Sequence, residues 1–148
     1  MLKALVVIAA SILPTAAFAE PWFGFDEGAF YGNGTKDGEA VLMLRCKDNQ
    51  IALFYIAADD VSRFGLAEGS AVTTKVLLNQ SVEHAFDSVW PQVAIGGDGA
   101  RTIGRDIATA NGNIVVTLED AAGREVTRNN FSSVGSGAAV RPVLEKCR

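Results

Sequence analysis

His84 is the only histidine in the chain, and Asp87 follows it three positions later. Together with a serine, these residues have the types found in a Ser-His-Asp triad, in which the histidine takes the proton of the nucleophile. However, His84 also alternates with Val82 and Phe86, which is the pattern of one face of a β-strand. We therefore expect His84 to be a half-buried strand residue with a satisfied ring nitrogen rather than a catalytic base.

Other enzyme motifs are incomplete in this chain. One histidine and two distant cysteines do not form the closely spaced ligand set of a zinc site, so we expect neither a metal nor a cofactor. Gly135-Ser136-Gly137 resembles part of a nucleophile elbow, but no histidine follows it, and capping of a helix accounts for the serine. The glycine-rich segment 96–99 has no following Lys-Ser/Thr, so it is a flexible turn rather than a phosphate loop. The sequence therefore predicts a protein that is not an enzyme.

The first nineteen residues have the pattern of a secretory signal peptide. Lys3 supplies a positive charge, residues 4–12 form a short apolar stretch, and Ala17-Phe18-Ala19 offers small residues at a cleavage site. The apolar stretch is too short to serve as a membrane span. We expect a signal peptide over residues 1–19, a single exported domain over residues 20–148, and a periplasmic or secreted location.

The net charge of the chain bears on which partners it can bind. The net charge is −4, and removal of the positive Lys3 changes it to −5 (−4 − 1). No basic run is present, so we do not expect a nucleic acid partner.

Cys46 and Cys147 are the two cysteines, and in an oxidising compartment such a pair is most simply a disulfide. The alternative is a pair of separate buried thiols.

Period-two alternation of apolar residues predicts strands separated by polar turns. The predicted strands cover residues 41–46, 51–56, 72–78, 82–90, 114–118 and 124–131. The turn at residues 47–50 would join the first two of these strands into a hairpin with Cys46 near its tip. A short helix is predicted over residues 101–110, and a second one would begin at Ser136 as its cap and end near Cys147. The fold class is thus mainly β, as an antiparallel β-sandwich or small barrel with one or two short helices and one disulfide.

Two segments are candidates for contact with a partner. Trp22, Phe23 and Phe25 belong to an aromatic cluster behind the cleavage site, which we expect to cover the sandwich as a strand; an exposed aromatic patch is the alternative that would suit a partner. Gly97 and Asp98 lie in the flexible glycine-rich segment.

We expect a non-enzymatic binding or accessory domain that recognises a protein or a cell-envelope component. The alternatives are an inhibitor or immunity protein of an exported hydrolase, which would insert the glycine-rich loop, and, less favoured, a small hydrolase that uses His84.

Two motifs carry a resemblance to a known group of proteins. Residues 42–49 match the pattern L-x-x-R-C-x-x-N, and residues 131–139 match F-x-x-x-G-x-x-x-A before the final cysteine. In these segments the chain resembles small periplasmic proteins of Gram-negative bacteria, in particular the accessory proteins of type VI secretion and their uncharacterised relatives. The resemblance implies a disulfide-stapled β-rich domain without catalytic residues, in which Cys46 and Cys147 form the bridge.

Overall fold

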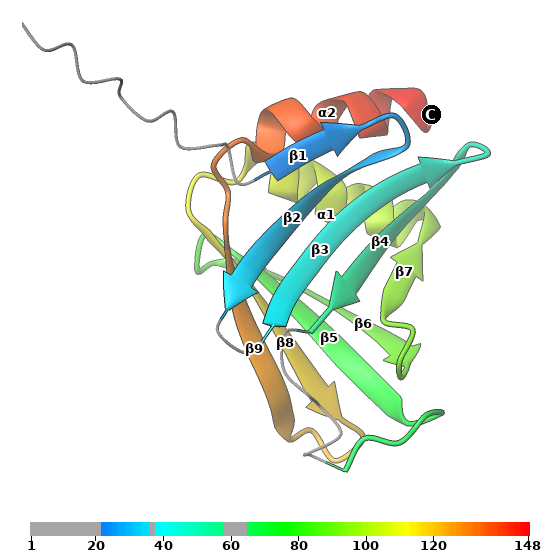
Figure 1. Ribbon diagram of the computed structural model, residues 1–148, viewed down its shortest axis with the longest axis vertical. Helices are drawn as coiled ribbons and strands as arrows, with labels where there is room; N and C mark the ends of the chain where they lie inside the picture. The colour runs from blue at the N-terminus through cyan, green and yellow to red at the C-terminus, as the bar shows by residue number, and fades with distance from the viewer. Residues whose placement is uncertain (1–21, 36–37, 58–64) are drawn as a thin grey trace, which may run out of the picture.

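Two antiparallel sheets and two helices make up the computed structural model of the protein (Figure 1). The structure describes residues 22–35, 38–57 and 65–148, with the side chains of residues 30–39 excepted. The expected signal peptide and the expected start of the mature chain at Glu20 lie outside these ranges. Within them the two sheets stay separate, so the prediction of an antiparallel sandwich with two short helices is confirmed and no closed barrel is formed.

The first sheet, sheet A, has five strands in the order β1-β2-β3-β4-β7. Their bounds are β1 Trp22–Phe25, β2 Gly28–Thr35, β3 Gly38–Lys47, β4 Gln50–Ile56 and β7 Ala94–Gly96. The second sheet, sheet B, has four strands in the order β6-β5-β8-β9. Their bounds are β5 Ala71–Leu78, β6 Val82–Val89, β8 Asn113–Asp120 and β9 Glu125–Ser132. All neighbouring strands are antiparallel, as the short polar turns predicted.

The turn between β3 and β4 shows how local sequence sets the strand register. Asp48 and Asn49 have φ values of 50° and 60°, so both lie in the left-handed region. Two such residues in succession form the tight turn whose twist matches that of the flanking strands, and Asn and Asp tolerate this conformation best among residues with a side chain. The turn pairs Cys46 with Ile51, close to the tip of the hairpin as predicted.

The core lies between the sheets and beneath the helices, and strand alternation determines which residues enter it. On β3, Leu42, Leu44 and Cys46 are buried, while Val41, Met43 and Arg45 on the opposite side are only half-buried. Each fully buried leucine contributes about 1.5–3 kcal/mol relative to an exposed one. The side of β3 that faces the helices and sheet B therefore stabilises the fold.

Helix α1 (Gly97–Thr109) packs against sheet A through the buried residues Ile103 and Ile107, which confirms the predicted helix. It begins four residues before the predicted start, so the interpretation of segment 96–99 as a flexible turn is wrong. Gly97 has a φ of +63°, which glycine adopts without steric cost and which lets the chain pass directly from β7 into the helix. Asp98 lies in the first turn, where a carboxylate stabilises the positive end of the helix dipole.

Helix α2 (Ser136–Lys146) packs on α1 and on β1, β2 and β3. The prediction that Ser136 caps this helix is wrong. Gly135 occupies the cap position in the left-handed conformation, and no side chain caps the helix. The buried hydroxyl of Ser136 instead donates a hydrogen bond of 2.7 Å to the carbonyl of Ile107, so it joins the two helices.

The disulfide between Cys46 and Cys147 is present, as predicted, with the Cα atoms 5.7 Å apart. Both cysteines are buried, at 3% and 0% exposure. Arg101 of α1 donates a further hydrogen bond to the carbonyl of Cys147. The end of α2 is thus bound to the β3–β4 hairpin by a covalent bond and to α1 by a hydrogen bond.

Loss of this bridge is expected to destabilise the domain. The two cysteines are 101 positions apart, and closing so long a loop restricts the unfolded chain strongly. We expect the double variant Cys46→Ala, Cys147→Ala to lose about 2–5 kcal/mol of unfolding free energy. Urea unfolding of the oxidised protein and of the variant measures this difference, and coincident midpoints would contradict the expectation.

Candidate functional site

His84 on β6 is hydrogen-bonded to a carboxylate of helix α1. Its Nε2 lies 2.6 Å from Oδ2 of Asp106, and the His84 side chain is 21% exposed. The pair joins the edge strand of sheet B to a helix that packs on sheet A. This arrangement confirms the prediction of a half-buried strand residue with a satisfied nitrogen.

Asp87 does not serve as the partner of His84, so the Ser-His-Asp arrangement considered for a hydrolase is wrong. Residues three apart on a strand point to opposite faces, and Asp87 accepts a hydrogen bond of 2.7 Å from the hydroxyl of Thr73 on the outer side of sheet B. Among the residues that the structure describes, His84 contacts no serine or threonine hydroxyl. Ser136 is buried and donates to Ile107, away from this pair.

Neither a metal-ligand cluster nor a membrane-spanning helix occurs in the described ranges. No group of three or more His, Cys, Asp or Glu side chains there lies close enough together to hold a metal ion. None of the described helices is long and apolar enough to cross a membrane.

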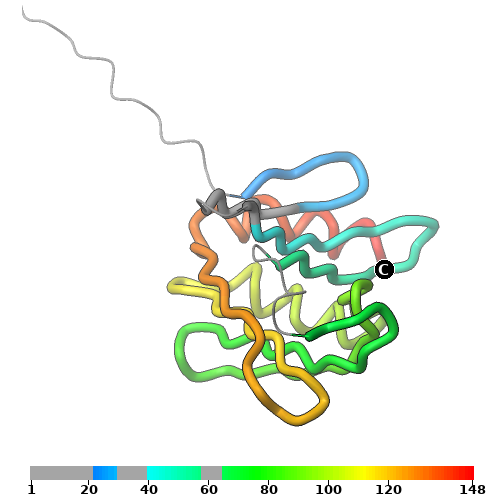
Figure 2. The backbone as a smooth tube through the Cα atoms, turned by 60° about the horizontal axis from the view of Figure 1, so that its bottom comes forward, coloured from blue at the N-terminus to red at the C-terminus, as the bar shows by residue number. Residues whose placement is uncertain are grey.

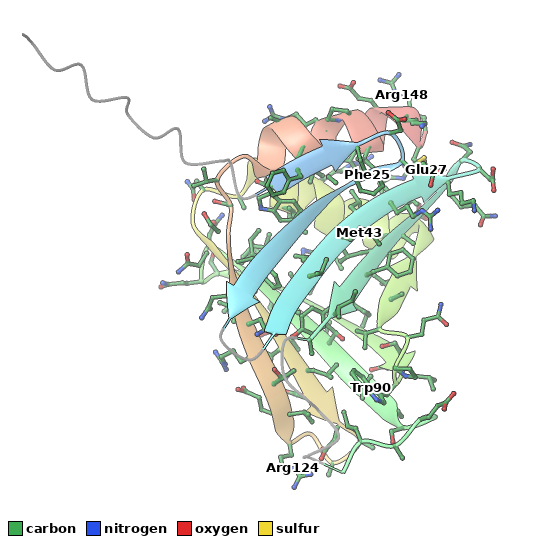
Figure 3. The ribbon with its side chains drawn as sticks, in the orientation of Figure 1. Phe25, Glu27, Met43, Trp90, Arg124 and Arg148 are labelled. Carbon is green, nitrogen blue, oxygen red and sulfur yellow. A yellow bond between two sulfur atoms is a disulfide. The ribbon has the colours of Figure 1, made fainter. Side chains whose placement is uncertain are left out.

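The most distinctive surface is the outer face of sheet A, which we define by Phe23, Val41, Met43, Phe54 and Ile56. The strand register places Phe23, Met43 and Phe54 in one row across the sheet, with Val41 and Ile56 in the next row. Phe23 is 47% exposed and Ile56 56% exposed, while the others are half-buried. Figure 3 shows Met43 on the side of β3 that is turned away from the helices. Within the described part of the chain, no element covers this apolar face.

A paired charge lies at one end of the outer face. Arg45 donates from Nε and Nη2 to Oε2 of Glu27, at 3.2 and 2.8 Å. The hydrogen bond from Arg45 holds the pKa of Glu27 below its ordinary value. Beside it, a hollow of about 210 Å³ is bordered by Arg45, Lys47, Gln50 and Phe54, among others. The outer face therefore combines an apolar centre with a polar, charge-compensated end.

The outer face of sheet B provides a comparison within the same molecule. There Lys75 pairs with Glu119 at 2.8 Å, and Arg128 pairs with Glu125 at 2.8 Å. The hydrogen bond to Glu119 raises the pKa of Lys75. This is the usual composition of a sheet face in contact with water. The outer face of sheet B also exposes Val89, but it carries two ion pairs, whereas the centre of the outer face of sheet A carries none among the described residues.

The residues predicted to contact a partner do not form one site. Trp22 is only 3% exposed, and its indole N–H donates a hydrogen bond of 2.7 Å to the carbonyl of Ser132, so it belongs to the core rather than to an exposed patch. Phe23 and Phe25 are exposed, at 47% and 43%, on the edge strand β1. Gly97 and Asp98 are exposed after β7, which is the opposite edge of the same sheet.

Sequence reasoning missed Met43, Phe54 and Ile56 as candidates, although a signal was present. Strands β3 and β4 carry apolar residues on both alternating sides, as in VLML and IALFYI. Strands with this composition are usually covered on both faces. In the described structure only one of these faces is covered.

In comparisons with protein-family models, with curated proteins and with solved structures, nothing matches this chain. The resemblance to type VI secretion accessory proteins therefore stays a prediction from two segments.

The pair His84–Asp106 is expected to act as a structural contact. His84→Gln and Asp106→Asn should each lower the unfolding free energy by about 0.5–1.5 kcal/mol, because each weakens the same hydrogen bond by replacing one of its partners with an amide. For the same reason the double variant should lose less than the sum of the two. Urea unfolding of the three variants measures this coupling. Asp87→Asn is the matched control, and a loss confined to that control would refute the assignment.

The pair Glu27–Arg45 makes the stability depend on acid pH. Since the pKa of Glu27 lies below its ordinary value of 4.5 in the folded state, the pair stabilises the fold above that pH. The contribution is lost as the pH falls through the lower, folded-state pKa. Glu27→Gln should therefore show a smaller drop in urea midpoint between pH 7 and pH 3 than the parent protein. Glu68→Gln, at an exposed glutamate without an ion pair in the described ranges, should behave like the parent; equal drops for all three proteins would contradict this.

Proposed function

We propose that this protein is a non-enzymatic, exported binding or accessory domain that recognises a protein or a cell-envelope component through the outer face of sheet A. The observation that carries the proposal is the apolar face formed by Phe23, Val41, Met43, Phe54 and Ile56, which no element covers within the described ranges. Contiguous exposed apolar patches are rare on soluble monomers and commonly mark interaction sites.

The composition of the face suits contact with another protein. Aromatic and methionine side chains are enriched in the centres of protein interfaces, whereas charged residues are depleted there. The outer face has Phe23, Met43 and Phe54 in its central row and its charged pair, Arg45–Glu27, at one end. An apolar centre with a polar border is the usual arrangement of a binding surface.

The contacts of the titratable groups favour binding over catalysis. His84 is engaged by Asp106, and the serine of the elbow-like motif, Ser136, donates to a backbone carbonyl. The inhibitor or immunity function is not favoured, because it needs an inserting loop and segment 96–99 is the end of β7 and the first turn of α1.

The buried disulfide supports an exported location for the domain. A bridge between residues 101 positions apart persists where thiols are oxidised, outside the bacterial cytoplasm. This accords with the signal peptide expected from the first nineteen residues. An accessory role in secretion, as the resemblance to type VI proteins implies, is one form that the proposed function takes.

Capture of proteins from a cell-envelope extract, compared between the parent protein and variants that carry a charge on the outer face, tests this proposal. The oxidised mature chain, residues 20–148, is immobilised and exposed to an envelope extract, and bound components are quantified by mass spectrometry. Met43→Lys and Ile56→Glu should each reduce capture of a specific component by about tenfold or more, because a charge placed in the centre of an apolar interface loses its hydration. Met43 is half-buried and Ile56 is 56% exposed, so the fold should be retained.

Val134→Lys is the matched control for this experiment. Val134 is 60% exposed and follows β9 of the other sheet, so this substitution adds a charge outside the outer face. Its capture should equal that of the parent protein. Capture that survives both face variants, with unchanged circular dichroism spectra, would refute the proposed surface.

A further inference from the structure

A groove runs between the edge strand of sheet A and helix α2. Strand β1 is the last strand on that side of the sheet, and α2 contacts it directly. Figures 1 and 2 both show the β1–β2 hairpin beside α2. The groove has a volume of about 320 Å³ and is bordered by residues 24–28 on one side and by Ala138, Ala139, Pro142, Val143 and Lys146 on the other. An edge strand next to a helix is a geometry in which proteins bind extended peptides.

The backbone N–H and C=O groups of Gly24 point outward from the open edge of sheet A. The hairpin has a two-residue loop, Asp26–Glu27, with Phe25 paired to Gly28. The pair flanking such a loop exchanges both hydrogen bonds, and the bonding direction alternates from residue to residue along an antiparallel strand. The N–H and C=O of Gly24 therefore point away from β2. Gly24 is exposed, and these two groups have no partner among the described residues.

The absence of a side chain at Gly24 creates the hollow in the groove. A Cβ atom placed on Gly24 would meet no atom within 4 Å. Gly24 is paired with the buried Ala29, so this space lies on the side of β1 that faces α2. Across the groove, α2 presents the small side chains of Ala138 and Ala139. The hollow can therefore hold the side chain of another molecule, since no described residue of this protein fills it.

Two of the charged side chains at the rim of the groove already have partners. Lys146 donates a hydrogen bond of 2.7 Å from Nζ to the carbonyl of Asp26, and Glu27 is paired with Arg45 at 2.8 Å. The helix side of the groove presents apolar carbon from Ala139, Pro142 and Val143, and the carboxylate of Asp26 lies at the rim, where it has no hydrogen bond or ion pair among the described residues. The matching ligand has an extended backbone and an apolar side chain.

We propose that an extended segment of a partner protein adds to β1 as a further strand of sheet A. Its backbone bonds to the N–H and C=O of Gly24, and one apolar side chain fills the hollow between β1 and α2. The inference rests on the proposed function in one respect, namely that the domain binds a protein. It assigns that binding a second surface, at the edge of the sheet rather than on its outer face.

A second copy of this chain fits the groove less well. If two β1 strands paired with each other, the side chains directed toward the hollow would come from the helix-facing side of β1. That side carries only Trp22 and Gly24. Trp22 is buried in its own core and bonded to Ser132, and Gly24 has no side chain. The hollow would then stay empty, so the geometry favours a partner segment over self-association.

Synthetic heptapeptides test this site directly. The probe is an acetylated and amidated peptide of alternating threonine and serine with leucine at its centre, and the comparison peptide has aspartate there. The ¹⁵N-labelled mature protein is titrated with each peptide and followed by amide chemical shifts. We expect saturable shifts centred on Gly24 with the leucine peptide, with a Kd of about 1 mM, and slower hydrogen exchange of the Gly24 amide when the peptide is bound. The aspartate peptide should bind at least about tenfold more weakly, because its charge would be buried in an apolar hollow.

Two variants fill the hollow from opposite sides. Gly24→Leu and Ala138→Leu should each weaken binding of the leucine peptide by about tenfold or more, and neither position is crowded or buried. Ala85→Leu is the matched control, because Ala85 is exposed on β6, the edge strand of the other sheet. It should bind the peptide like the parent protein. Met43→Lys should also keep peptide binding, which separates this site from the outer face.

The outcomes distinguish this inference from the proposed function. No saturable shift at Gly24, or unchanged peptide binding by folded Gly24→Leu and Ala138→Leu, overturns the strand-addition site even when envelope capture depends on Met43. Protection of the Gly24 amide without peptide, increasing with protein concentration, overturns it in favour of self-association. Peptide binding that depends on Gly24 while capture is indifferent to Met43 supports the edge site and refutes the outer face.

Discussion

The bond between Cys46 and Cys147 is the constraint on which both candidate surfaces depend. It attaches the end of α2 to the tip of the β3–β4 hairpin, and Arg101 holds the same end of α2 against α1. With α2 in this position, the helix covers one side of sheet A, while no described element covers the other side. The same attachment sets the distance between α2 and β1, and so the width of the groove. The covalent bond therefore fixes the end of α2 that borders both the buried face of sheet A and the groove at its edge.

Much of the fold could be predicted from the sequence, because strand alternation and turn chemistry are local signals. The alternation at residues 41–46 and 51–56, with the turn at Asp48 and Asn49 between them, predicted the first well-defined hairpin and the position of Cys46. The start of α1 could not be predicted in the same way. Glycines at 96, 97 and 99 indicate a turn by composition, yet the helix begins at Gly97, and Ala100 in its first turn is fully buried. Tertiary burial here overrides local propensity.

The candidate sites were harder to predict because each depends on residues far apart in the chain. Asp87 was the natural partner of His84 by proximity, but the true partner, Asp106, lies 22 positions away on a helix. The register that aligns Phe23, Met43 and Phe54 in one row is likewise invisible without the pairing of four strands. Gly24 carries almost no sequence signal at all. Its importance comes from what is missing, namely a side chain opposite Ala138 and a backbone partner at the edge.

The contact between Trp22 and Ser132 has a consequence for the order of folding. It joins residues 110 positions apart, so the chain must close a very long loop before β1 is anchored beside β9. Contacts of such sequence separation form late and slowly, since the entropy of loop closure opposes them until the rest of the fold is in place. We therefore expect the groove at β1 to be among the last features to form. A partner that binds this groove would therefore not bind nascent or partly folded chains, but only the fully folded domain.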